Sequence, residues 1–236
     1  MPENELAALI AQLESVYADE HPVLDGILAY GSEAVEPLIA QLQDNDEYGV
    51  RTDACVLLGK IGDPLAIPAL FEALFDWDIR HVRPQAQIAL ANFGRPALEY
   101  VLARLDGGDT RTTTACIYML LAFAGPDAIS ALIRLAASPV FEIRLRAAEA
   151  LCRLGECQYL DLLADVLETD DGVLAHFAIH AIHQLVEKSH CLAEVDSRVA
   201  PILNNIREPN SGEAASPMRQ VFQQTAIRIL EARERS

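Results

Sequence analysis

Three histidines with helical spacing are the first residues of this sequence that could carry chemistry. His176, His180 and His183 follow one another at i, i+4 and i+7, which places them on one side of a helix. Imidazole nitrogens bind zinc, iron and other first-row metal ions, and carboxylates or thiols from neighbouring helices can complete such a site. The spacing leaves three interpretations open: ordinary hydrogen-bonded histidines, a polar patch that binds a protein partner, and a transition-metal site.

Other signs of catalysis are missing from the sequence. It contains no glycine-rich phosphate loop, no serine in a nucleophile elbow, and no cysteine with a convincing basic partner. We therefore predict no catalytic residues. The five cysteines are odd in number, scattered and mostly within apolar helical runs, so we expect reduced thiols packed as small hydrophobic side chains rather than disulfides.

Charge and hydropathy restrict the partners. The chain has 35 acidic and 18 basic residues, a net charge of -17, which disfavours nucleic acid because phosphate backbones bind through Lys and Arg. Residues 1–50 contain many acids and no Lys or Arg, so they could attract a protein partner with a basic surface or simply form a solvated face. No apolar stretch is long enough to span a membrane, and the acidic N-terminus does not resemble a secretory signal. We expect a cytoplasmic protein that does not bind membranes.

The elements that position these residues follow from an internal repeat. Five glycines recur at nearly constant spacing, and each precedes apolar residues at i, i+3, i+4 and i+7, then a polar turn and a second helical pattern. A glycine at this point would end each second helix in the left-handed conformation. Two helices per unit predict stacked helix pairs that bury their apolar faces against one another. The glycines are Gly31, Gly62, Gly94, Gly125 and Gly155.

The second helices share a more specific signature, in which an aliphatic residue and an arginine are followed by alanine, leucine and glycine. The clearest copies are Val50-Arg51 with Ala54, Leu58 and Gly62, Val82-Arg83 with Ala86, Leu90 and Gly94, and Ile143-Arg144 with Ala147, Leu151 and Gly155. With the Gly-Asp-Pro turn at residues 62–64, this signature resembles the HEAT repeat family. It is most similar to the short bacterial HEAT-like repeats first grouped with phycobilisome lyases, and the resemblance spans about residues 31–186.

The resemblance implies an all-α fold, a right-handed superhelical solenoid with first helices on its convex side and second helices on its concave side. It implies a single domain, with an N-terminal capping pair at residues 1–30, five repeats at 31–186 and C-terminal capping helices at 187–236. It also implies a ladder between turn aspartates and helix arginines, because a guanidinium can bridge carboxylates and carbonyls. The expected ladder residues are Asp46 with Arg51, Asp78 with Arg83, and Arg144.

These features favour a non-catalytic protein-binding scaffold or adaptor, which grips a helix or an extended segment. Its concave face would comprise Asp53, Lys60, Gln85, Asn92, Arg146, Glu149, Arg153, Phe177 and His180. The resemblance leaves a bilin lyase-like or phycobilisome-associated role open, with an open-chain tetrapyrrole as cofactor and a phycobiliprotein as partner. A protein that binds a transition metal on its His-rich helix is the third possibility. The HEAT-like hydroxylases hold a di-iron centre with adjacent His-Glu pairs, which do not occur in this sequence, so that chemistry is set aside.

Overall fold

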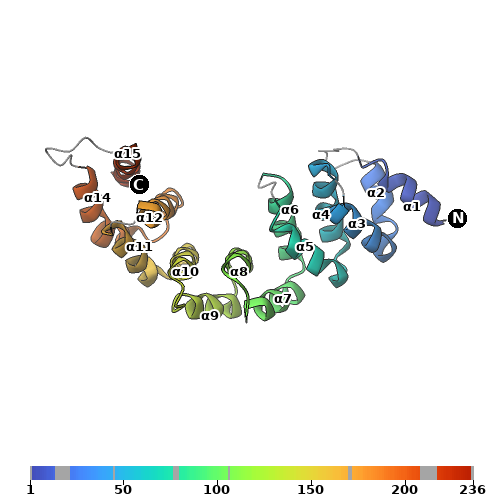
Figure 1. Cartoon of the computed structure of the whole chain (residues 1–236), viewed down its shortest axis with the longest axis horizontal. Helices are drawn as coiled ribbons and strands as arrows, with labels where there is room; N and C mark the ends of the chain where they lie inside the picture. The colour runs from blue at the N-terminus through green and yellow to red at the C-terminus, as the bar shows by residue number, and fades with distance from the viewer. Residues whose placement is uncertain are drawn as a thin grey trace. The chain divides into compact units, whose positions relative to one another are not determined.

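The chain consists of stacked helix pairs. The computed structural model describes residues 2–13, 22–44, 46–76, 80–105, 107–169, 172–207 and 217–234, and every regular element within these ranges is a helix (Figure 1). The chain divides into two compact units, Met1–Phe123 and Ala124–Ser236, called unit 1 and unit 2 below. The predicted all-α solenoid of HEAT-like pairs is confirmed. None of the described helices is both long enough and apolar enough to cross a membrane.

Unit 1 contains the expected N-terminal pair and the first three repeats. The pair is formed by α1 (Pro2–Ile10) and α2 (Pro22–Leu28). In each repeat the apolar stripe forms the first helix and the following segment forms the second. The helices are α3 (Val35–Asp44), α4 (Tyr48–Ile61), α5 (Ile67–Ala73), α6 (Val82–Asn92), α7 (Arg95–Leu105) and α8 (Thr110–Phe123), with short 3-10 turns at Gly31–Ala34 and Pro64–Ala66.

Unit 2 contains the last two repeats and the C-terminal helices. Its helices are α9 (Pro126–Leu135), α10 (Phe141–Arg153), α11 (Leu160–Leu167), α12 (Gly172–Glu187), the single turn α13 (Leu192–Glu194), α14 (Ala200–Arg207) and α15 (Pro217–Glu234). A 3-10 turn at Cys157–Tyr159 precedes α11, and a π-helical turn at Val195–Val199 precedes α14. The C-terminal helix is docked, because α15 packs against α12 and α14 and its Ala226 and Ile229 side chains are fully buried.

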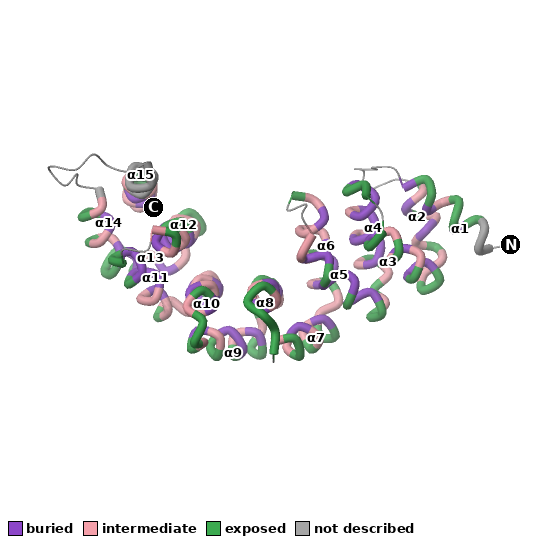
Figure 2. The backbone as a smooth tube through the Cα atoms, viewed as in Figure 1, coloured by how far each residue is buried: buried purple, intermediate pink, exposed green. Residues whose placement is uncertain are grey.

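Within each unit the second helices pack side by side and form one layer, while the first helices form the other (Figure 1). This second-helix layer comprises α4, α6 and α8 in unit 1, and α10 and α12, continued by α15, in unit 2. The signature alanines and leucines of the second helices are buried. Figure 2 colours the buried stretches of these helices purple. Helices α4 and α6 approach so closely that a methyl group added at Gly59 would lie 2.8 Å from Cβ of Ala89.

Four of the five repeat glycines have the predicted left-handed conformation with a positive φ: Gly31, Gly62, Gly94 and Gly155. Gly62, with φ of 72°, is the left-handed C-terminal residue of α4, and its backbone N–H donates to the carbonyl of Leu58. Gly125 differs, because its φ of -94° is extended and it begins α9 instead. The left-handed position falls one residue earlier, on Ala124 with φ of 51°. An alanine there carries the steric cost that glycine avoids.

The cysteines depart from the sequence-based expectation. Cys157 and Cys191 form a disulfide with Cα atoms 5.3 Å apart, so the prediction that all five thiols are reduced is wrong. The bond joins the turn before α11 to the residue before α13, and it therefore brackets the whole α11–α12 pair. The sequence did not indicate this disulfide, because the two cysteines are 34 residues apart and only the antiparallel return of α12 brings them together. The other three, Cys55, Cys116 and Cys152, are buried free thiols.

Candidate functional site

A pocket of about 380 Å³ lies between α10 and α12 in the second-helix layer of unit 2. Four of its lining residues are apolar and four are polar or charged. The apolar group is Leu145, Val173, Leu174 and Phe177, and the polar group is Glu142, Arg146, His176 and His180. Its volume falls within the usual range for small-ligand sites, and its combination of apolar walls with a few polar groups is typical of binding sites.

Helix periodicity positions the pocket residues. On α10, Glu142 and Arg146 are one turn apart, and Leu145 beside them is turned inward and buried. On α12, Val173, Phe177 and His180 follow at i, i+4 and i+7, so all three face α10. Val173 is 74% exposed although it is apolar, which marks the mouth of the pocket.

Arg146 is held in place at the edge of the pocket. Its Nε and Nη2 donate to Oε1 of Glu142 at 3.1 Å and 2.8 Å. Its guanidinium carbon also lies 5.0 Å from the centre of the Phe177 ring, a cation–π contact between α10 and α12. The two contacts fix a planar cation beside an apolar wall before any ligand arrives.

A largely buried carboxylate, Glu149, lies one turn further along α10. Burial raises the pKa of Glu149, and the positive charges of Arg153, Arg146, His180 and Lys188 oppose this increase. Arg153 Nη1 is 3.8 Å from Glu149 Oε1, and the Glu149 side chain is only 14% exposed. Three of the predicted concave-face residues, Arg146, Phe177 and His180, line the pocket, while Glu149 and Arg153 pair with each other further along α10.

The three predicted metal ligands do not converge. His176 and His180 are exposed and line the pocket, with His180 Nε2 3.0 Å from Nε2 of Gln184. His183 instead lies beside Glu187, with 3.7 Å between Nε2 and Oε1. Among the described residues, no three His, Cys, Asp or Glu side chains are grouped so that they could hold a metal ion. The i, i+4, i+7 spacing aligned the histidines along α12, but alignment on one helix does not bring three ligands to one point.

The remaining predicted concave-face residues belong to unit 1. Lys60 and Asn92 are exposed and Gln85 is half-buried, all on the second helices α4 and α6. Asp53 is 7% exposed, so its inclusion in a binding face is wrong. Asp53 lies on the side of α4 that packs into the unit, together with the buried Ala54 and Leu57.

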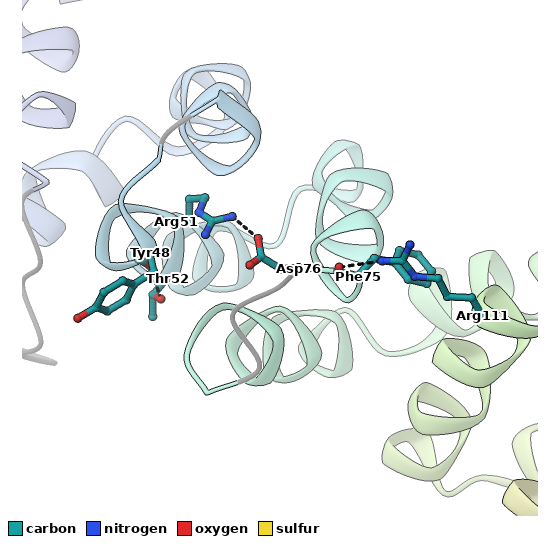
Figure 3. Close-up of polar contacts among 6 residues, drawn as sticks. All are labelled: Tyr48, Arg51, Thr52, Phe75, Asp76 and Arg111. Atoms are coloured by element: carbon teal, nitrogen blue, oxygen red, sulfur yellow. Dashed lines mark hydrogen bonds and ion pairs between the residues drawn. The ribbon is translucent and has the colours of Figure 1, made fainter.

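The arginine ladder is present with different partners (Figure 3). Arg51 forms a buried ion pair with Asp76 of the following turn rather than with the predicted Asp46. Arg111 donates to the carbonyl of Phe75 at 3.0 Å and stacks on its ring. Arginines from α4 and α8 therefore contact adjacent residues of one turn (Figure 3). The sequence pattern missed both Asp76 and Arg111.

The other ladder predictions have separate outcomes. Arg144 donates to the carbonyls of Ser138 and Pro139 at 2.8 Å and 3.2 Å, which is the expected contact between a helix arginine and turn carbonyls. Asp78 lies outside the described residues, so its pairing with Arg83 stays a prediction. Arg144 and Arg51 both stabilise turns, and neither lines the pocket.

Sequence reasoning missed half of the pocket. Glu142, Leu145, Val173 and Leu174 were not singled out, because each is unremarkable within its own helix. Two local signals were available, the Glu142 to Arg146 spacing and the apolar Val173 beside the predicted Phe177 and His180. Neither signal indicates a pocket until α10 and α12 are placed side by side.

The repeats match a known family. A family model described as HEAT repeats matches residues 35–120 and 98–183, and no curated protein matches the chain. A solved engineered protein is 20% identical, covers 85% of this chain and 96% of its own, and has a TM-score of 0.41. The complex of CpcE and CpcF of phycocyanin lyase from Nostoc sp. PCC7120 is 23% identical, covering 98% and 94%, with a TM-score of 0.41. Human deoxyhypusine hydroxylase in complex with glycerol is 18% identical, covering 99% and 97%, with a TM-score of 0.29. Because the family matches span more than half of its length, this chain belongs to the HEAT repeat family.

Proposed function

We propose that the chain is a non-catalytic scaffold that holds a segment of a partner protein on the second-helix layer of unit 2. The observation that carries this proposal is the pocket between α10 and α12, where an exposed Val173 and the Phe177 ring adjoin the fixed guanidinium of Arg146. Apolar anchors surrounded by polar groups are the usual centre of a protein interface. One side chain of the partner would occupy the pocket, and the flanking residues would lie along α10 and α12.

Support for a binding role rather than catalysis comes from the titratable groups. Burial raises the pKa of the Cys55, Cys116 and Cys152 thiols to about 12, so none of them supplies a thiolate nucleophile at neutral pH. His180 of the pocket has Gln184 of the same helix beside it. This contact suits recognition of a ligand.

The bilin lyase-like and metal-binding roles expected from the sequence have no specific observation in their favour. A bilin lyase-like role with an open-chain tetrapyrrole rests on the family resemblance, and a metal-binding role rests on the histidine spacing. A basic partner surface is favoured by the acid-rich N-terminal region, which lies in unit 1 and apart from the pocket residues in sequence. Cytoplasmic residence stays a prediction, and the Cys157–Cys191 disulfide argues against it, because such bonds persist mainly in oxidising compartments.

A peptide selection tests the proposed function. The full-length chain is used to select binders from a phage-displayed random peptide library, and the affinities of the selected peptides are measured by fluorescence anisotropy. Val173→Trp places an indole ring at the mouth of the pocket, while Ile133→Trp places the same ring on an exposed position of α9. We expect Val173→Trp to weaken binding by about tenfold or more and Ile133→Trp to leave it unchanged. Peptides that bind Val173→Trp as tightly as the original chain would contradict the proposal.

A further inference from the structure

We infer that the Cys157–Cys191 disulfide is a redox switch for the last repeat, and hence for the side of the pocket that α12 supplies. While the bond is formed, α11 and α12 stay packed against α10. After reduction they open together with the helices that follow them. The regulatory consequence rests on the proposed function, because the regulated site is the same pocket.

The disulfide closes a loop that contains the whole last repeat. Cys157 lies in the turn before α11, and Cys191 follows α12 at a separation of 34 residues. A covalent link across such a loop restrains the unfolded segment far more than the folded one, so it suppresses opening of the helices inside the loop. One of these helices is α12, which supplies Val173 and Phe177 to the pocket. The bond therefore stabilises one side of the pocket.

The chain leaves α12 through a strained turn. Ser189 and Cys191 are both left-handed, with φ of 57° and 53°, although neither is a glycine. This conformation crowds a side chain against the backbone, and it persists only where the surrounding structure imposes it. At Ser189 the backbone N–H donates to the carbonyl of Val186 and helps to hold the turn. At Cys191 the disulfide fixes the side chain, so reduction removes a restraint from this turn.

The helices after Cys191 are attached to the repeats by moderate noncovalent contacts. Arg198 Nη1 is 2.7 Å from Oδ1 of Asp161 on α11, but the two side chains are 59% and 44% exposed, and exposed pairs contribute little. Units at the end of a stack have few neighbours and open before the centre does. The buried apolar side chains among those described in this segment are small or medium in size, namely Val195, Val199, Leu203, Ala226 and Ile229.

A dithiol reductant opens the bond in two exchange steps. Its thiolate attacks Sγ of the half-buried Cys157 and forms a mixed disulfide, while Cys191 leaves as a thiolate and takes up a proton. The second thiolate of the reductant then displaces Cys157, which is protonated in turn, and the reductant becomes an intramolecular disulfide. The reduced Cys191 thiol has an acceptor in place, because its sulfur lies 3.4 Å from the carbonyl oxygen of Cys152. That contact keeps Cys191 close to Cys157 whenever the repeat is closed, so the bond can form again.

The free thiol of Cys152 reports on this opening. Cys152 lies on α10, fully buried in an apolar cluster with side chains of α11, α12 and α15. Burial raises the pKa of its thiol to about 12, so it is unreactive while the last repeat is closed. Cys55 and Cys116 are also buried free thiols, but they belong to unit 1. They are therefore internal controls in the same chain.

Labelling with N-ethylmaleimide, quantified by peptide mass spectrometry, tests the inference. The full-length chain is compared with a double variant, Cys157→Ser with Cys191→Ser, which lacks the bond without any reductant. We expect Cys152 to react about 100-fold faster in the double variant, in line with the usual effect of a disulfide on unfolding, and Cys55 and Cys116 to react at unchanged rates. The original chain, reduced with dithiothreitol and separated from it, should behave like the double variant, and reoxidation should restore protection.

A selected peptide that is sensitive to Val173→Trp links the opening to the pocket. Such a peptide contacts α10 and α12 together, so it binds only the closed repeat. At ten times its Kd it should therefore slow the labelling of Cys152 in the double variant about tenfold.

The outcomes separate the redox switch from the proposed function. Equal labelling of Cys152 with and without the disulfide, or an equal rise at Cys55 and Cys116, would overturn the switch and leave the scaffold function standing. Faster labelling of Cys152 that no selected peptide slows would support the switch in the last repeat, but would overturn its link to the pocket and the proposed binding there. A selection without any peptide sensitive to Val173→Trp would overturn the proposed function, while the labelling rates alone would decide on the switch.

Discussion

The close contact between α4 and α6 predicts that Gly59→Ala destabilises the protein. An ideal Cβ at Gly59 would lie 2.8 Å from Cβ of Ala89 and 2.9 Å from its Cα, whereas carbon atoms pack at about 3.5 to 4.0 Å. Because the Ala89 Cα belongs to the backbone, no rotamer change relieves the overlap. Helices α4 and α6 would have to move apart, and their packed layer would lose contacts along its length.

Two opposing effects set the magnitude. Overpacking a well-packed core costs about 1 to 3 kcal/mol. Replacing glycine by alanine inside a helix contributes about 1 kcal/mol in the other direction. Since backbone carbon takes part in the overlap, we take the upper half of the overpacking range and expect a net loss of about 1 to 2 kcal/mol. Urea unfolding followed by circular dichroism at 222 nm measures it.

Two companion variants make the test specific. Gly172→Ala is the matched control, because a Cβ there meets no atom within 4 Å, and it should be neutral or slightly stabilising. Adding Ala89→Gly to Gly59→Ala removes the clashing methyl group, so the double variant should show a favourable coupling energy. If Gly59→Ala is as stable as the original chain, or the coupling is zero, the close approach of α4 and α6 is wrong.

Three further predictions concern other parts of the fold. Ala124→Gly should raise stability by about 0.5 to 1 kcal/mol in thermal or urea unfolding, because Ala124 has a φ of 51°; a loss would refute the left-handed assignment. Cys157→Ser should lower the stability of the oxidised protein by about 3 to 4 kcal/mol, since the bond to Cys191 closes a loop across a separation of 34 residues, and a reducing agent should lower only the original chain to the same level. Glu149→Gln should stabilise the protein at pH 7. Burial raises the pKa of Glu149 in the folded protein above its value in the unfolded chain. Ionisation of Glu149 therefore destabilises the folded state increasingly as the pH rises from the unfolded to the folded pKa. Unfolding curves of the original chain and of Glu149→Gln should differ at pH 7 and coincide at pH 4.

Local sequence determined the helices of this protein. The apolar stripe at i, i+3, i+4 and i+7 marks a surface that must be buried, so the first helices appear where the stripes do, as at α3 and α9. Glycines such as Gly62 end helices because only a residue without a side chain adopts the left-handed conformation without cost. Ala124 shows the limit of that rule, since the helix end shifted by one residue although the glycine was present.

Tertiary structure decided the pairings and the candidate site. The two walls of the pocket come from separate repeats. Helix α12 supplies Val173 and Phe177, helix α10 supplies Arg146, and the walls meet only because α10 and α12 pack side by side. Packing between segments distant in the chain likewise explains why the partner of Arg51 is Asp76 and why Cys157 joins Cys191. A repeat pattern specifies which face of each helix is buried, but which side chains of two neighbouring helices come into register depends on their separation and rotation. Those quantities are set by packing between helices that are far apart in the chain, and no single segment contains them.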